Sequence, residues 1–249
     1  LKAAYGVSSR FPLEKVDEKL KEIINKLILD YQFIGVRDAA TKRLVDCAKG
    51  KSEAILVGDP TFVYEFPISA EMGEKILLER FHVQPGKKRI GLMLNDFQMS
   101  TEIVRKYGEN IEVVALFNYC PGARNALNIS PLEWAAVIYA LDGLITTYFH
   151  GMCFAIKGDI PFVVIEKREI VEDCYSKSYD LLSRYGMERY YIRGENINIV
   201  EKRINDLVLE IVNGKANRDY SKIRLKEKES FQCFSSALCA MGKQKDMGI

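Results

Sequence analysis

Histidine is scarce in this chain, since His82 and His150 are the only two among 249 residues. The six cysteines are scattered without a C-x-x-C pair, and no H-x-x-x-H or D-x-D pattern occurs. These absences argue against a zinc site and a disulfide framework. We therefore expect no metal or other cofactor, and a reducing, cytoplasmic setting.

Long apolar runs and a strong charge bias are missing too. No run approaches the roughly 18 apolar residues that a membrane span requires, and no signal peptide is visible. The net charge of +2 gives no reason to expect a nucleic-acid partner. The chain begins with Leu1 rather than Met, so we expect N-terminal residues of the natural protein to be missing.

The segments that are present alternate between strand-like apolar runs and helical periodicity, which predicts parallel sheets covered by helices. A break at Gln84-Pro85-Gly86 separates two such series. We expect a partial N-terminal α/β domain over residues 1–85. Its predicted strands are 2–8, 33–36 and 54–57, and its predicted helices are 13–29, 39–48 and 68–81.

The second series is more complete and predicts a Rossmann-like domain over residues 86–213. Residues 214–249 form a basic stretch followed by a possible helix at 230–241. We interpret them as a tail that packs back on the body or frays, with an anionic surface or polymer as the alternative. The second domain's predicted strands are 89–94, 111–117, 143–147, 161–165 and 190–192, and its predicted helices are 99–107, 131–141, 152–157, 177–185 and 197–212.

Residues 142–165 carry the most functional information. They predict a β-α-β unit in which His150 lies in the turn between the end of the strand and the start of the helix. Ligands of open α/β sheets bind at such positions, and the helix start favours anions. A histidine there can exchange a proton near neutral pH. The alternative is that His150-Gly151 only shapes the turn.

Four motifs, in order, resemble those of the polysaccharide pyruvyl transferase family. Residues 148–151 (Y-F-H-G) resemble its F-H-G turn, residues 34–38 its V-R-D turn and residues 57–61 its D-P-T element. Residues 176–189 resemble its C-terminal stretch with paired leucines. The resemblance covers roughly residues 5–212.

The resemblance implies two Rossmann-like domains arranged as in B-type glycosyltransferases, with the N-terminal domain lacking its first half. It also implies transfer of a pyruvyl group from phosphoenolpyruvate to a hydroxyl of a sugar or polysaccharide acceptor. Other branches of the family carry R-L-H-G or S-F-H-G where this chain has Tyr148. The arginine that would grip the donor is therefore absent here.

The reaction implied by the resemblance needs an acid and positive charge. His150 is the predicted general acid. We expect the backbone N–H groups of Gly151 and Met152 to bind the donor phosphate. Arg37 is the leading cation, expected to line one cleft with His150, and Lys177 is a further candidate. The alternatives are an exposed Arg37 that pairs with Asp38 or Glu53, and Lys177 as a plain surface residue.

For the acceptor's proton, Asp38 and Asp59 are the candidate bases. Asp38 as a helix cap and Asp59 as a turn residue are the competing interpretations. Asn95 and Asp96 end a strand and are expected near the site, and Tyr148 could supply a hydroxyl in place of the missing arginine.

Two other functions stay open. A B-type glycosyltransferase using a nucleotide sugar would need a carboxylate for the ribose, for which Glu166 is the candidate. A non-catalytic binding protein of the same fold is the second alternative, favoured by Tyr148. We interpret His82 as structural.

Overall fold

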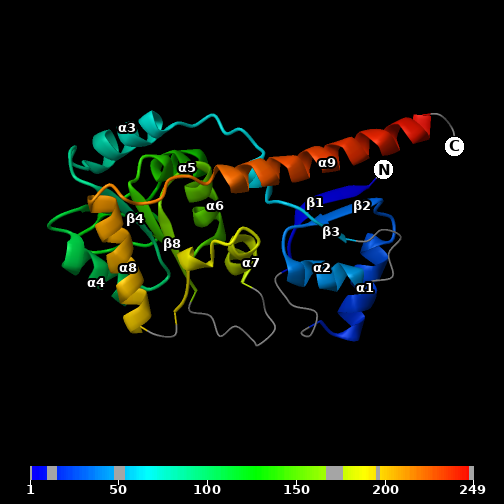
Figure 1. Ribbon diagram of the computed structural model, residues 1–249, viewed down its shortest axis with the longest axis horizontal. Coiled ribbons are helices and arrows are strands. Elements are labelled where there is room, and N and C mark those ends of the chain that lie inside the picture. Colours follow the sequence, from blue (N-terminus) through cyan, green and yellow to red (C-terminus); the bar gives the residue numbers. More distant parts are fainter. Residues whose placement is uncertain (1, 10–15, 48–53, 167–175, 195–196, 247–249) are drawn as a thin grey trace. The chain divides into compact units, whose positions relative to one another are not determined.

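The computed structural model describes the chain except for residues 1, 10–15, 48–53, 167–175, 195–196 and 247–249 (Figure 1). The described residues form two compact units. The first unit draws on Leu1–Tyr64, Glu169–Arg184 and Lys222–Ile249. The second unit draws on Glu65–Arg168 and Tyr185–Ser221.

The first unit is built on a parallel sheet in the order β1-β2-β3. Asp17 and Asp38 cap the helices that follow β1 and β2, since each carboxylate accepts a first-turn N–H. The elements are β1 (Ala3–Val7), α1 (Glu18–Ile28), β2 (Phe33–Val36), α2 (Ala39–Asp46), β3 (Ala54–Leu56), the 3-10 helix η2 (Pro60–Phe62), α7 (Lys177–Ser183) and α9 (Ser221–Asp246).

Helix α9 packs on this sheet through aromatic rings (Figure 1). The ring of Phe234 lies 4.8 Å from that of Tyr5 and 4.7 Å from that of Phe33, and Phe231 meets Tyr5 edge-on at 5.3 Å. The prediction of a basic tail before a short helix is therefore wrong, because one continuous helix begins at Ser221. Burial of these rings holds it on the first unit.

The second unit contains a six-stranded parallel sheet in the order β6-β5-β4-β7-β8-β9. Its elements are α3 (Ala70–Phe81), β4 (Arg89–Met93), α4 (Phe97–Tyr107), β5 (Glu112–Ala115), β6 (Arg124–Asn125), α5 (Pro131–Tyr139), β7 (Gly143–Thr146), α6 (Phe149–Lys157), β8 (Phe162–Glu166), the 3-10 helix η3 (Glu188–Tyr190), β9 (Tyr191–Arg193) and α8 (Ile197–Val212).

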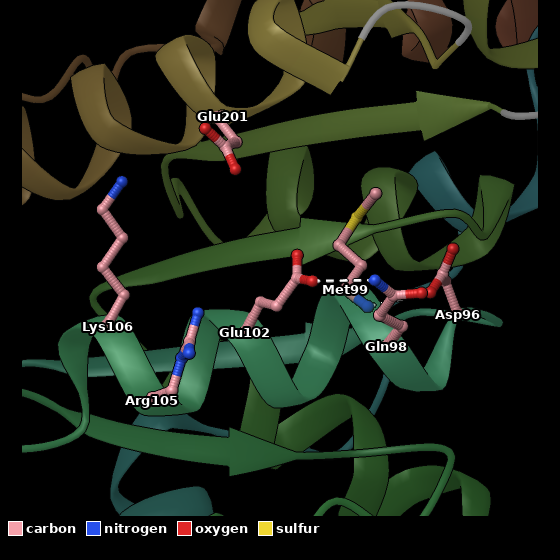
Figure 2. A pocket seen from close by; sticks show the side chains of 7 residues that line it. All are labelled: Asp96, Gln98, Met99, Glu102, Arg105, Lys106 and Glu201. Atoms are coloured by element: carbon pink, nitrogen blue, oxygen red, sulfur yellow. Dashed lines mark hydrogen bonds between the residues drawn. The ribbon is translucent and has the colours of Figure 1, made fainter.

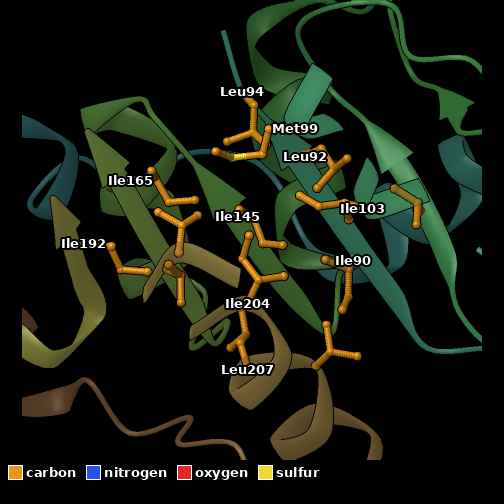
Figure 3. Packing of buried hydrophobic residues seen from close by; sticks show 14 of the residues in the cluster. Ile90, Leu92, Leu94, Met99, Ile103, Ile145, Ile165, Ile192, Ile204 and Leu207 are labelled. Atoms are coloured by element: carbon orange, nitrogen blue, oxygen red, sulfur yellow. The ribbon is translucent and has the colours of Figure 1, made fainter. Parts of the chain in front are cut away.

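Helices cover both faces of this sheet. Helices α4 and α8 lie on one face, where their apolar residues interdigitate with those of the strands (Figure 3). Ile90, Ile145 and Ile165 at the sheet centre are 0% exposed. Burial on both faces explains why these strands read as continuous apolar runs in the sequence.

Helix α3 packs closely against α5 in the second unit. A Cβ atom added to Gly73 would lie 2.0 Å from the backbone oxygen of Ala136. This contact explains a difference from the predicted domain ranges: the observed units divide after Tyr64, not after residue 85, because α3 buries its apolar side against α5. Likewise α7 and α9 belong to the first unit.

Most predicted elements are present, with ends shifted by a few residues. The predicted helix 13–29 begins at Glu18 within the described chain, and residues 13–15 lie outside the described residues. The two-residue strand β6 was not predicted, since it is too short to show a periodicity. In the part of the chain that the structure describes, no helix is long and apolar enough to cross a membrane.

The close approach of α3 to α5 gives the first testable prediction. Replacing Gly73 with Ala should lower the free energy of unfolding by about 2 kcal/mol, because the added methyl meets backbone that cannot rotate away. In an open helix the same change stabilises by up to about 1 kcal/mol. Urea denaturation measures the difference, with the exposed Lys75→Ala in the same helix as control. A Gly73→Ala protein as stable as the control would contradict the observed packing.

Candidate active site

The order of strands in the second unit reverses between β4 and β7. From β4 the chain proceeds through α4 to β5 on one side, and from β7 it proceeds through α6 to β8 on the other. The loops that leave the carboxyl ends of β4 and β7 therefore diverge to opposite faces. Such a reversal is where open parallel sheets bind ligands.

The turn from β7 into α6 is held by threonine side chains. The Tyr148 N–H donates to Thr146 Oγ1 at 2.9 Å, and the Thr147 hydroxyl donates to the Met93 carbonyl at 3.2 Å. Thr146 is fully buried. The strand β4 and the β7–α6 turn are thus joined directly.

Helix α6 begins at Phe149, earlier than the sequence predicts, with Tyr148 at the N-cap position. Met152 therefore lies in the second turn, and its N–H donates to the Tyr148 carbonyl at 3.2 Å. This N–H is engaged within the helix, and a role for Met152 in donor binding stays a prediction. The first-turn amides, which have no acceptor within the helix, are those of Phe149, His150 and Gly151.

Gly151 allows α6 to lie close to the sheet. A Cβ atom at this position would lie 2.8 Å from Thr146 Oγ1 and 3.0 Å from Met93 Sδ. The glycine of the F-H-G motif is thus required for packing at the point where the strand order reverses. Gly151 and Met152 are both buried.

Tyr148 reaches across the reversal. Its hydroxyl donates to Asn95 Oδ1 in the loop after β4, and its ring lies 4.3 Å from that of Phe117, which follows β5. Burial raises the pKa of the Tyr148 phenol above its ordinary value, so the group is a neutral donor. The prediction that Tyr148 and Asn95 share this edge agrees with the geometry.

His150 occupies the first turn of α6 and is exposed. Its imidazole meets the Phe149 ring edge-on, with centroids 5.4 Å apart. Tyr148, the N-cap residue of α6, makes no side-chain cap hydrogen bond. An accessible imidazole therefore lies beside a helix terminus whose dipole favours an anion.

The neighbouring helix α4 starts differently. Asp96 is its N-cap and accepts the Met99 N–H at 2.8 Å, so a carboxylate already serves that terminus. From Asp96 a groove of about 470 Å³ runs between α4 and α8 (Figure 2). Its lining mixes acidic, basic and amide side chains and was not predicted: Asp96, Gln98, Met99, Glu102, Arg105, Lys106 and Glu201.

In the first unit, Arg37 and Asp59 form an ion pair at the carboxyl ends of β2 and β3. Their side chains are 16% and 3% exposed. Burial by itself raises the pKa of Asp59, but hydrogen bonds from Thr61 and the charge of Arg37 together bring it below its ordinary value. The expected partners of an exposed Arg37 were Asp38 or Glu53, whereas the structure pairs a largely buried Arg37 with Asp59, and Glu53 lies outside the described residues.

Asp38 acts as a helix cap. Its Oδ1 accepts the Thr41 N–H at 2.7 Å and its Oδ2 accepts the Ser8 hydroxyl at 2.6 Å, while the residue is 2% exposed. The capping interpretation is confirmed. A role as general base stays a prediction.

Lys177 begins α7 after the cap Ser176, and its role in donor binding stays a prediction. The same helix carries charges that the sequence did not single out. Asp180 accepts the Ala39 N–H at 3.3 Å, and Arg184 donates to the Arg37 carbonyl at 3.2 Å and approaches Glu227 of α9 at 3.8 Å.

The remaining candidates have identifiable local roles. His82 ends α3 in a left-handed conformation, with φ 52°. Glu166 accepts a hydrogen bond from the Tyr191 hydroxyl at 3.3 Å, next to it in the sheet.

The Arg37–Asp59 pair gives a prediction about pH and stability. Because the folded pKa of Asp59 is lowered, its stabilisation is present above the unfolded value of about 3.9 and is lost as pH falls through the folded pKa. Asp59→Asn should lower the free energy of unfolding by about 3 kcal/mol at neutral pH, because the Arg37 guanidinium loses the Asp59 charge. The fall in the free energy of unfolding below pH ~4 should become shallower in this variant. Chemical denaturation at several pH values measures both effects.

The matched control is Asp30→Asn, which removes the exposed pair with Lys2. Exposed pairs contribute about 0–1 kcal/mol, so this variant should change little at either pH. If Asp59→Asn and Asp30→Asn lowered the free energy of unfolding equally, the Arg37–Asp59 pair would contribute no more than a surface ion pair.

Two solved structures of the wall teichoic acid polymerase TagF, one after a soak with CDPG, are similar to this chain at 15% and 11% identity, with TM-scores of 0.41 and 0.38. They match 92% and 94% of this chain, which spans 57% and 66% of the polymerase chains. No curated protein matches the chain.

The family comparison covers both the His150 turn and the Arg37 turn. A model of the polysaccharide pyruvyl transferases matches residues 2–169, which is more than half of the chain. This chain belongs to the polysaccharide pyruvyl transferase family.

Proposed function

We propose that this protein transfers a pyruvyl group from phosphoenolpyruvate to a sugar hydroxyl in polysaccharide biosynthesis, at the carboxyl edge of the second unit's sheet. The observation that carries the proposal is the exposed His150 in the first turn of α6, at the reversal between β4 and β7. Family membership supplies the class of reaction. A B-type arrangement of two domains is part of the same proposal.

The donor's phosphate and carboxylate need positive electrostatic potential. Of the two helix starts that flank the reversal, α4 is capped by the Asp96 carboxylate, whereas the N-cap residue of α6, Tyr148, gives no side-chain cap. An anion is repelled by the first and attracted by the second. We therefore assign the donor phosphate to the first turn of α6, with Gly151 as a backbone donor.

Ketal formation can then proceed with every proton accounted for. The His150 imidazolium gives a proton to the methylene carbon of phosphoenolpyruvate, and a sugar hydroxyl forms a bond to the carbon that bears phosphate. Neutral His150 recovers a proton from that hydroxyl. A second hydroxyl displaces the phosphate, which leaves with the remaining proton, and the products are a cyclic ketal and inorganic phosphate.

Tyr148 stands where other branches of the family have arginine. Its neutral hydroxyl is held by Asn95, which directs the phenol toward β4. In this proposal Tyr148 positions the donor by a hydrogen bond rather than by charge. Arg37 and Lys177 remain predicted donor ligands, and Asp38 a predicted base.

The role of His150 is tested by His150→Ala. Pyruvyl transfer should fall by about a hundredfold or more, because general acid catalysis contributes at least that much. Folding should be unaffected, since the side chain is exposed. The control is His82→Asn at the only other histidine, where asparagine tolerates the left-handed conformation.

Steady-state transfer with release of inorganic phosphate is the measurement, and thermal unfolding checks the fold of each variant. A folded His150→Ala protein with undiminished transfer would rule out the acid role. Equal losses in both histidine variants would point to a general effect on stability.

The donor site is tested by competition. Inorganic phosphate should raise the apparent Kd of phosphoenolpyruvate in proportion to its concentration, because inorganic phosphate and the donor's phosphoryl group would occupy the same first turn of α6. Isothermal titration at constant ionic strength measures this, with chloride as the control for screening. If phosphate acts no differently from chloride, the donor phosphate binds elsewhere.

A further inference from the structure

Aromatic side chains surround the carboxyl edge of the second unit's sheet. We call Phe97, Phe117, Tyr119 and Tyr148 the aromatic rim. They follow β4, β5 and β7, which are neighbours in the sheet. Phe97 is 62% exposed, Phe117 51% and Tyr119 64%.

The exposed rings follow two neighbouring strands, Phe97 after β4 and Phe117 and Tyr119 after β5. The half-buried ring of Tyr148 follows β7. Large apolar groups gathered at one place mark binding surfaces, whereas isolated ones need no explanation. Phe117 and Tyr148 also lie against each other, with centroids 4.3 Å apart and planes inclined by 46°. Asn118 holds the Phe117 loop to β4, since its amide donates to the Leu94 carbonyl at 2.8 Å. Phe117 and Tyr148 are therefore held against each other at the sheet edge that also carries His150.

The charges around the rim limit what can bind there. Residues 94–98, 116–120 and 146–151, which carry the rim, contain no lysine or arginine, and Asp96 is their one ionised acid. A polyanion such as nucleic acid would find no lysine or arginine on these loops. A nucleotide would find rings for its base but only a helix start for its phosphates. An uncharged ligand with flat apolar faces and hydroxyl edges has no such conflict.

Sugar rings have this chemistry. The C–H face of a pyranose packs on an aromatic ring, and its hydroxyls bond to amide and phenol groups such as those of Asn95 and Tyr119. We propose that the aromatic rim is the acceptor platform, which binds an uncharged pyranose beside His150. The inference rests on the proposed function for the identity of the reaction, and adds the chemical class of the acceptor and the residues that bind it.

The test measures binding of neutral trisaccharides of gluco, galacto and manno configuration to the full chain by saturation-transfer NMR and isothermal titration. At least one should bind, and Phe117→Ala and Tyr119→Ala should each raise its Kd by about tenfold, the order expected for one lost ring contact. Phe117→Trp should retain binding. The control is Tyr64→Ala, which removes a ring that is 60% exposed in the first unit.

Binding of phosphoenolpyruvate to the same variants separates the two claims. It should be unchanged in the rim variants. If no trisaccharide binds the unsubstituted protein, or if the rim variants bind as well as Tyr64→Ala, the platform is overturned while donor transfer stands. A rim that binds UDP-glucose or an anionic oligosaccharide in preference also overturns it. Rim-dependent trisaccharide binding without any affinity for phosphoenolpyruvate would support the platform and refute the proposed function.

Discussion

The reversal of strand order between β4 and β7 is the constraint from which the second unit's site follows. With every strand parallel, both loops must leave from one edge, yet α4 goes to one face and α6 to the other. The space above the reversal is therefore bordered by two helix starts and by the side chains that join them. Tyr148 and Asn95 make that junction across the two strands.

The two helix starts differ in their N-cap residues, and we assign the anion to one of them on this basis. Asp96 supplies α4 with negative charge, whereas α6 has only the Tyr148 backbone at its cap and needs Gly151 to fit against Met93. In the first unit Arg37 and Asp59 form an ion pair at the carboxyl edge. The start of α6 has no cap from its N-cap side chain, whereas Asp38 caps the start of α2 in the first unit.

Periodicity predicted the elements well because it reports burial. The apolar strand Phe33–Val36 and the amphipathic helix Ile197–Val212 have the predicted bounds. Periodicity does not predict features that depend on contacts between distant parts of the chain. Helix α3 joins the second unit through α5, and Arg37 meets Asp59 only in the folded sheet. The start of α6 was misplaced because Tyr148 and Phe149 carry no capping signal. The aromatic rim was missed because Phe117 and Tyr119 lie in a loop and Phe97 and Tyr148 stand at helix starts, where periodicity gives no information.

The most direct test of the central claim uses the scarcity of histidine. The ring Cε1–H resonances of His150 and His82 can be followed by NMR while phosphoenolpyruvate is added, with His82→Asn providing the assignment. A donor bound at the first turn of α6 should shift the His150 signal in a saturable way and leave His82 unchanged. Saturable binding of phosphoenolpyruvate with no change at His150, or with a change at His82 alone, would contradict a pyruvyl transfer site at the reversal between β4 and β7.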